Sequence, residues 1–135
     1  MKKVLFICVE NSCRSQMAEG FAKKLGYGII EAYSAGSRPS GEVNPDAIRV
    51  MQEEGIDISE NRSKSFQELP VKEFDFVITL GCKDTCPFIP AENHIEWDVD
   101  DPKGKNIDVF RKIKDQIKSK VQLFVERVAY VQNWK

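Results

Sequence analysis

The chain has 135 residues, of which 41% are hydrophobic and 30% are charged, and its formal net charge is −1 at pH 7. This length fits one domain with its own hydrophobic core, so we predict a single domain over residues 1–135. The near-neutral charge gives no reason to expect nucleic acid or a membrane as a partner, and no apolar run approaches the ~20 residues of a membrane span. Four cysteines without a secretion signal favour a reducing compartment, and we therefore expect a cytoplasmic protein.

The first predicted element is a strand over residues 4–8, which is apolar and ends at Cys8. A short polar loop follows, and residues 16–25 then place Met17 and Phe21 at helical spacing. A loop of this kind directs several backbone N–H groups inward at a helix N-terminus, where they can hold a tetrahedral oxyanion. The strand, loop and helix therefore predict an anion site beside Cys8.

Strands and helices alternate along the rest of the chain. We expect a strand over residues 29–34, a helix from the Asn44 cap to Gly55, a short extended segment over 56–59 and a short helix or irregular segment over 63–69. A buried strand over 74–80 is followed by a loop or partial helix over 81–90, a last strand over 94–99 and a long amphipathic helix from Val109 onward.

This alternation predicts an α/β fold: a single-domain central parallel sheet of about four strands with helices on both faces. The site of such a fold lies at the carboxyl ends of its strands. Cys8, Cys82 and Asp101 each follow a predicted strand, so we expect this edge of the sheet to bring them together.

The residue types around the first loop point to thiolate chemistry on an oxyanion. Backbone dipoles and Arg14 are expected to favour the thiolate form of Cys8, and the planar guanidinium of Arg14 matches two oxygens of a phosphate-like ion. Ser15 can donate a hydrogen bond to the Cys8 sulfur or cap the helix. The alternative is a buried structural cysteine beside a surface arginine. The substrate-binding residues predicted from the loop are Val9, Glu10, Asn11, Ser12, Cys13 and Arg14.

A cysteine followed after five residues by arginine and serine resembles the loop of the protein tyrosine phosphatases, and its place near the N-terminus resembles the low-molecular-weight family. The string Asn11–Gly20 is more similar to the thioredoxin-coupled arsenate reductases built on that fold. The resemblance implies a low-molecular-weight phosphatase-like fold, arsenate as the substrate and a function in arsenical resistance. It also implies that Asp101, followed by Pro102, protonates the departing oxygen, with Asp100 as the alternative acid. Without the resemblance, these carboxylates would be interpreted as an acidic surface loop.

The resemblance gives Cys82 and Cys86 a role in a disulfide relay. Cys8 attacks arsenic, Cys82 attacks the arsenylated Cys8 and forms the first disulfide, and Cys86 then takes over that disulfide. No cofactor is bound; an external thiol reductant, either thioredoxin or glutathione with glutaredoxin, restores the thiols. Three residues separate Cys82 from Cys86, fewer than in thioredoxin-coupled members. Members that use glutathione and glutaredoxin also have closely spaced cysteines, so both reductants are candidates.

Two other interpretations of this cysteine pair are two inert buried thiols or a structural zinc site. Zinc would need four ligands, and the candidates are Cys82, Cys86 and His94, because Cys13 faces the anion loop. We therefore expect no metal, and no catalytic part for His94.

Some members of the resembling family hold potassium beside the loop with positions equivalent to Asn11, Glu19 and Ser34. The carboxylate that usually completes this set is replaced here by Lys64, whose ammonium group can take the place of the ion. We predict that no potassium binds.

The alternative function is a low-molecular-weight tyrosine phosphatase that uses Cys8, Arg14 and Asp101. Such phosphatases usually carry aromatic residues directly after the Asp-Pro pair, whereas this chain has Lys103, Gly104 and Lys105. We therefore predict an arsenate reductase with weak phosphatase side activity that acts as a monomer. A non-catalytic anion sensor would have lost the nucleophile, the arginine or the acid, and all three are present.

Overall fold

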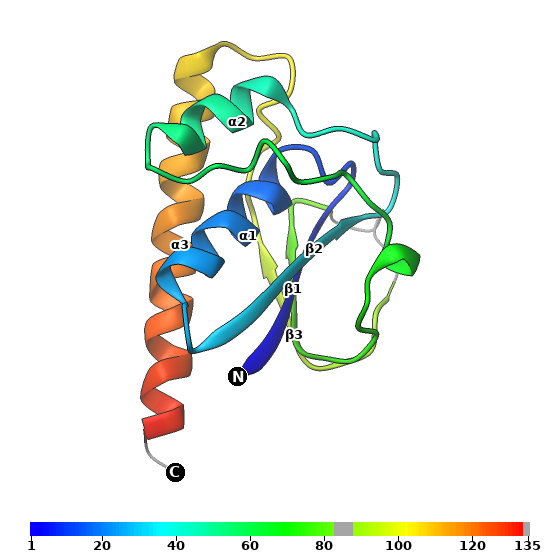
Figure 1. Ribbon diagram of the computed structural model, residues 1–135, viewed down its shortest axis with the longest axis vertical. Coiled ribbons are helices and arrows are strands. Elements are labelled where there is room, and N and C mark those ends of the chain that lie inside the picture. Colours follow the sequence, from blue (N-terminus) through cyan, green and yellow to red (C-terminus); the bar gives the residue numbers. More distant parts are fainter. Residues whose placement is uncertain (83–87, 134–135) are drawn as a thin grey trace.

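The computed structural model describes residues 1–82 and 88–133. Within these residues, four parallel strands form one sheet in the order β2-β1-β3-β4 (Figure 1). The strands are β1 (Lys2–Cys8), β2 (Ile30–Gly36), β3 (Phe74–Leu80) and β4 (Ala91–Trp97). The four-stranded parallel sheet predicted from the alternation of strands and helices is confirmed.

Strand β1 lies in the centre of the sheet, between β2 and β3. Its residues Val4–Cys8 are at most 2% exposed, as expected for a strand covered on both faces. Alternate side chains of β1 enter two separate apolar clusters: Val4 and Phe6 pack in one, and Leu5 and Ile7 in the other.

The helices are distributed unevenly over the two faces of the sheet. Helices α1 (Arg14–Leu25), α2 (Pro45–Gln52) and α3 (Ile107–Asn133) pack against one another on the face of Val4 and Phe6, with α3 running along the molecule (Figure 1). In the described part of the opposite face, the helical element is the short 3-10 helix η1 (Phe66–Glu68). None of the helices in residues 1–82 and 88–133 has the length and apolarity of a membrane-spanning segment.

Helix α2 begins as its sequence predicts. The Asn44 side chain accepts a hydrogen bond of 2.8 Å from the backbone N–H of Asp46, and Pro45 occupies the first turn.

The short segment predicted over residues 56–59 and the last predicted strand can be compared with the structure. Residues 56–59 form no strand: the N–H of Ile56 donates to the carbonyl of Met51 at the end of α2, and Ile58 is buried without a neighbouring strand. The last strand lies at Ala91–Trp97 rather than 94–99, because its pairing with β3 runs from Ala91 to Trp97.

In the register of the sheet, the carboxyl ends of neighbouring strands lie side by side. Cys8 pairs with Gly36, and Leu80 pairs with Trp97. The loops that follow these residues therefore meet at one edge of the sheet.

Candidate functional site

The loop over residues 9–13 turns its carbonyl groups away from its own centre. The carbonyl oxygen of Val9 accepts from the N–H of Arg38 at 2.8 Å, and that of Ser12 accepts from the N–H of Asn44 at 3.0 Å. The carbonyl oxygen of Glu10 accepts from the Ser63 hydroxyl at 2.6 Å. Because the C=O and the following N–H of a peptide unit point in opposite directions, the amides after these carbonyls point inward. This is the cradle of N–H groups expected of an oxyanion site.

Asn11 holds this loop in shape. Its φ of 51° is the one positive value of a non-glycine residue in the described chain. Its side-chain amide donates to the Ser15 hydroxyl at 2.7 Å, and its side-chain oxygen accepts from Gln16 Nε2 at 2.9 Å and from the N–H of Lys64 at 3.0 Å. Asn11 therefore ties the loop to the start of α1 and to the segment before η1.

Cys8 and Ser15 face one another at the base of the loop. The Cys8 Sγ lies 2.9 Å from the Ser15 hydroxyl and 3.4 Å from the Ser15 backbone nitrogen, which donates to it. Both residues are buried. Ser15 therefore contacts the sulfur through both its backbone and its side chain.

Arg14 is buried at the first turn of α1 and reaches across to the loop after β4. Its Nη1 donates to the carbonyl oxygen of Val99 at 3.0 Å, and its Nη2 lies 3.7 Å from a carboxylate oxygen of Asp101. Its Nε is buried without a hydrogen-bond partner. An oxyanion in the loop would supply the acceptor that this N–H lacks.

Gly81 makes room for the arginine. Its φ is +70°, and a Cβ atom at this position would lie 2.1 Å from Arg14 Nη1 and 2.4 Å from the Val99 oxygen. Only glycine fits such an approach without displacing the guanidinium.

A small hollow opens beside Cys8. Its lining residues come from the loop after β1, the start of α1 and the loop after β4: Cys8, Glu10, Ser12, Cys13, Arg14, Asp101 and Lys103. Asp101 thus lies with the nucleophile and the arginine, whereas Asp100 is not part of this lining. The side chain of Asp101 is 48% exposed, so it can exchange protons with solvent.

The other cysteines differ in their surroundings. Burial, with Asp101 and Cys8 as further causes, raises the pKa of the Cys13 thiol to about 12, which keeps Cys13 protonated and unreactive. Cys82 is buried, and its Sγ lies 3.6 Å from the carbonyl oxygen of Ile7, the residue before Cys8. Cys86 lies outside the described residues.

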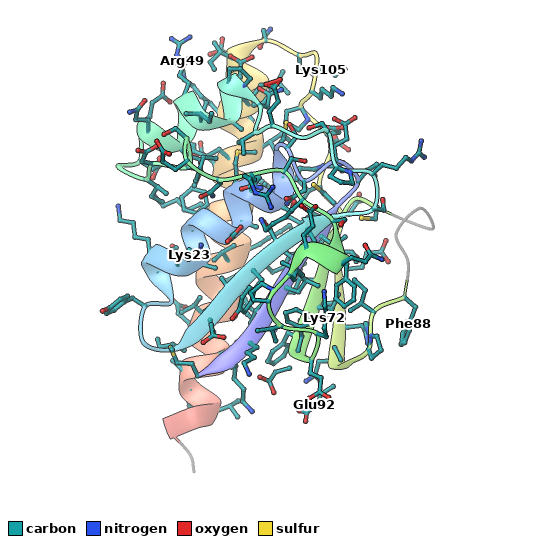
Figure 2. All side chains as sticks on the ribbon, turned by 45° about the vertical axis from the view of Figure 1, so that its right-hand side comes forward. Lys23, Arg49, Lys72, Phe88, Glu92 and Lys105 are labelled. Atoms are coloured by element: carbon teal, nitrogen blue, oxygen red, sulfur yellow. The ribbon has the colours of Figure 1, made fainter. Side chains whose placement is uncertain are left out.

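His94 takes no part in the hollow. Its ring stacks on Phe88 with 4.8 Å between centroids, and its Nε2 lies 2.7 Å from the carbonyl oxygen of Ile89. Phe88 itself is 80% exposed and projects at the edge of the sheet (Figure 2).

Lys64 occupies the place predicted for it beside the loop. Its Nζ lies 3.3 Å from the Ser34 hydroxyl and 3.9 Å from the Glu19 carboxylate, and Ser34 also donates to Glu19. Burial lowers the pKa of Lys64, while the Glu19 carboxylate opposes this shift. Within residues 1–82 and 88–133, no three His, Cys, Asp or Glu side chains gather as a metal site.

Sequence reasoning missed part of the site. Gln16 is fully buried and donates to the carbonyl of Arg62 as well as to Asn11, so it connects the loop to a segment far along the chain. The sequence indicated this role of Gln16 only by placing a side-chain amide at the start of a helix face that is otherwise apolar. The Gly81 approach and an ion pair between Glu10 and Lys103 had no local signal, because each joins loops that are distant in sequence.

Comparisons with known proteins agree with this geometry. A family model described as low molecular weight phosphotyrosine protein phosphatase matches residues 3–133. A glutaredoxin arsenate reductase from Synechocystis is 42% identical over 132 residues, which are 96% of this chain and 100% of the relative. A solved arsenate reductase in its phosphate binding state matches with a TM-score of 0.85 at 42% identity, over 95% of this chain and 99% of the other. A thioredoxin-dependent arsenate reductase from Corynebacterium glutamicum matches with a TM-score of 0.78 at 28% identity, over 97% of this chain and 63% of the other.

Proposed function

The chain belongs to the low molecular weight phosphotyrosine protein phosphatase family, and on that premise we propose that it is an arsenate reductase that converts arsenate to arsenite for arsenic detoxification. Two named relatives support the substrate: the Synechocystis enzyme and the structure with bound phosphate are both arsenate reductases of 42% identity. Phosphate and arsenate have the same tetrahedral shape and charge, so a cradle of backbone N–H groups with Arg14 suits either ion.

The first step is attack of the Cys8 thiolate on arsenic(V). A sulfur–arsenic bond forms, one arsenic–oxygen bond breaks, and Asp101 gives its proton to the oxygen, which leaves as water. The inward amides of the loop and the Arg14 guanidinium stabilise the negative charge on the remaining oxygens. Ser15 supports the thiolate from 2.9 Å.

The second step reduces arsenic. The Cys82 thiolate attacks the Cys8 sulfur, a disulfide forms, and the electrons of the sulfur–arsenic bond pass to arsenic, which leaves as arsenite. Cys86 then attacks Cys82, releases the Cys8 thiolate and leaves a Cys82–Cys86 disulfide. Two thiols of an external reductant restore this pair, so the enzyme needs no bound cofactor.

One observation favours the reductase over a simple phosphatase. The Cys82 sulfur is buried 3.6 Å from the carbonyl of Ile7, the residue before the nucleophile, and it belongs to a disulfide. A phosphatase has no use for a redox-active cysteine at this place, because water releases its phosphocysteine. Weak phosphatase activity follows from the shared first step.

Two thiol systems are candidates for the reductant. Glutaredoxin is supported by the name of the Synechocystis relative at 42% identity and by the close spacing of the two cysteines. Thioredoxin is supported by the Corynebacterium relative at 28% identity. Both belong to the cytoplasm, where we expect this chain to act as a monomer.

The test is arsenate-dependent oxidation of NADPH, with thioredoxin and its reductase in one assay and with glutathione, glutaredoxin and glutathione reductase in another. We expect turnover with at least one system and its loss in Cys8→Ser, Cys82→Ser and Cys86→Ser. The control is hydrolysis of p-nitrophenyl phosphate, which Cys8→Ser should abolish and Cys82→Ser should retain. Brisk hydrolysis without any arsenate-dependent turnover would make the protein a phosphatase instead.

A further inference from the structure

An ion pair joins the two loops that border the hollow. The Nζ of Lys103 lies 2.8 Å from each carboxylate oxygen of Glu10. Glu10 belongs to the loop after β1, and Lys103 belongs to the loop after β4, 93 positions further along the chain. This pair is the shortest ionic link between the loop that carries the oxyanion site and the loop that carries Asp101 among the contacts described above.

The pair lies at the mouth of the hollow. Cys8 and Arg14, at its base, are buried, whereas the side chains of Glu10 and Lys103 are 33% and 53% exposed. The backbone N–H of Lys103 also donates to Asp101 at 3.0 Å, so the lysine lies directly next to the acid. Both residues of the pair line the hollow, so a group that extends from it toward solvent would lie close to them.

We propose that Glu10 and Lys103 form a clasp that determines substrate specificity: it admits a small inorganic oxyanion and disfavours the organic group of a phosphate or arsenate ester. The inference rests on the proposed function, because it requires an oxyanion held in the loop beside Cys8. The hollow is small, with a volume of about 10 Å³. An inorganic oxyanion carries no group beyond its oxygens, whereas the carbon group of an ester would project through the mouth and separate the pair.

The clasp is a partial barrier. Both side chains are partly exposed, and exposed ion pairs contribute little to stability, so an ester can open it. The discrimination to expect from this one pair is therefore no more than about fivefold in relative affinity.

The experiment compares the binding of inorganic phosphate and of phenylphosphonate, which carries an aryl group on the same tetrahedral centre. Dissociation constants are measured by isothermal titration calorimetry without any reductant, in the wild type, Glu10→Gln and Lys103→Met. We expect the ratio of the phenylphosphonate constant to the phosphate constant to fall by about twofold to fivefold in both variants. The double variant Glu10→Lys with Lys103→Glu, which restores an ion pair, should return the ratio toward the wild-type value.

The two single variants separate the clasp from a general effect of charge. Removing a carboxylate strengthens anion binding, and removing an ammonium weakens it, so a field effect alone moves the affinities in opposite directions and leaves the ratio unchanged. Lys105→Met is the matched control: Lys105 is exposed on the same loop (Figure 2) and should not change the ratio. High salt, which screens an exposed pair, should lower the ratio in the wild type without any substitution.

Each outcome of these binding experiments either supports or overturns the clasp. An unchanged ratio in both single variants and in high salt overturns the clasp, even if the chain reduces arsenate. A lowered ratio supports the clasp even if neither reductant supports arsenate turnover, because binding needs no reductant. A wild type that binds no inorganic phosphate overturns both the clasp and the proposed function.

Discussion

Gly81→Ala should weaken oxyanion binding without any change to a residue that touches the ion. A Cβ atom at this position would lie 2.1 Å from Arg14 Nη1, where ordinary contacts begin at 3.4 Å, so the guanidinium would have to move by about 1 Å. This movement breaks the 3.0 Å hydrogen bond to the Val99 carbonyl and misaligns the fork of the arginine. A hydrogen bond with a charged group contributes about 1.5 to 3 kcal/mol, so we expect phosphate affinity to fall roughly 10- to 100-fold.

The control for this variant is Gly104→Ala. Gly104 has a φ of +80°, close to the +70° of Gly81, but a Cβ atom there would meet nothing within 4 Å. Gly104→Ala should lose about 1 to 2 kcal/mol of unfolding free energy from the left-handed backbone, measured by urea denaturation, and Gly81→Ala should lose more because its Cβ also meets the Val99 oxygen at 2.4 Å. Only Gly81→Ala should lose phosphate affinity, measured by isothermal titration calorimetry. If Gly81→Ala binds phosphate as Gly104→Ala does, the close approach does not position Arg14.

Two further predictions concern ion pairs away from the hollow. Hydrogen bonds from Lys114 and Lys118 lower the pKa of Glu54 to about 2, so its stabilising effect is present above pH ~4.5 and is lost as the pH falls toward 2. The difference in unfolding free energy between wild type and Glu54→Gln should therefore be about 1 to 2 kcal/mol at pH 6 and should vanish near pH 2; a constant difference across this range would contradict the assignment. Because the Lys64 ammonium lies 3.3 Å from the Ser34 hydroxyl, potassium chloride should give the wild type the same melting temperature as sodium chloride at equal ionic strength. Lys64→Asp should melt higher in potassium than in sodium, and a wild type that responds to potassium would show that Lys64 does not replace the ion.

The sequence predicts most of the fold because its strongest patterns are local. The apolar run that ends at Cys8 and the cap at Asn44 both form the elements expected of them. Residues 56–59 were harder, since Ile58 is buried by packing behind α2 and not by a strand ladder. The extent of β4 depends on its pairing with β3, which no pattern within β4 reveals.

The candidate site likewise has one part that local sequence patterns predict and another part that they do not. The loop after β1 is one continuous string, so its shape and the place of Arg14 follow from spacing. Contacts between distant loops, such as the Gly81 approach to Arg14 and the Lys103 pair with Glu10, arise only when the parallel register brings the strand ends together. The predicted strand ends placed Asp101 near the nucleophile, where it lines the hollow, whereas only the resemblance to a known family proposed it as the acid.

The bonds of Asn11 have a consequence for the thermodynamics of binding. Its side chain joins Ser15, Gln16 and Lys64, so the protein's own hydrogen bonds hold the loop in shape. The conformational entropy of the loop is thus lost when the chain folds, and little of it is left to lose when an oxyanion arrives. An incoming ion meets amides that already point at it, and its association should be limited by diffusion and dehydration rather than by reorganisation of the loop. Asn11 therefore contributes both to the stability of the fold and to the preorganisation of the anion site.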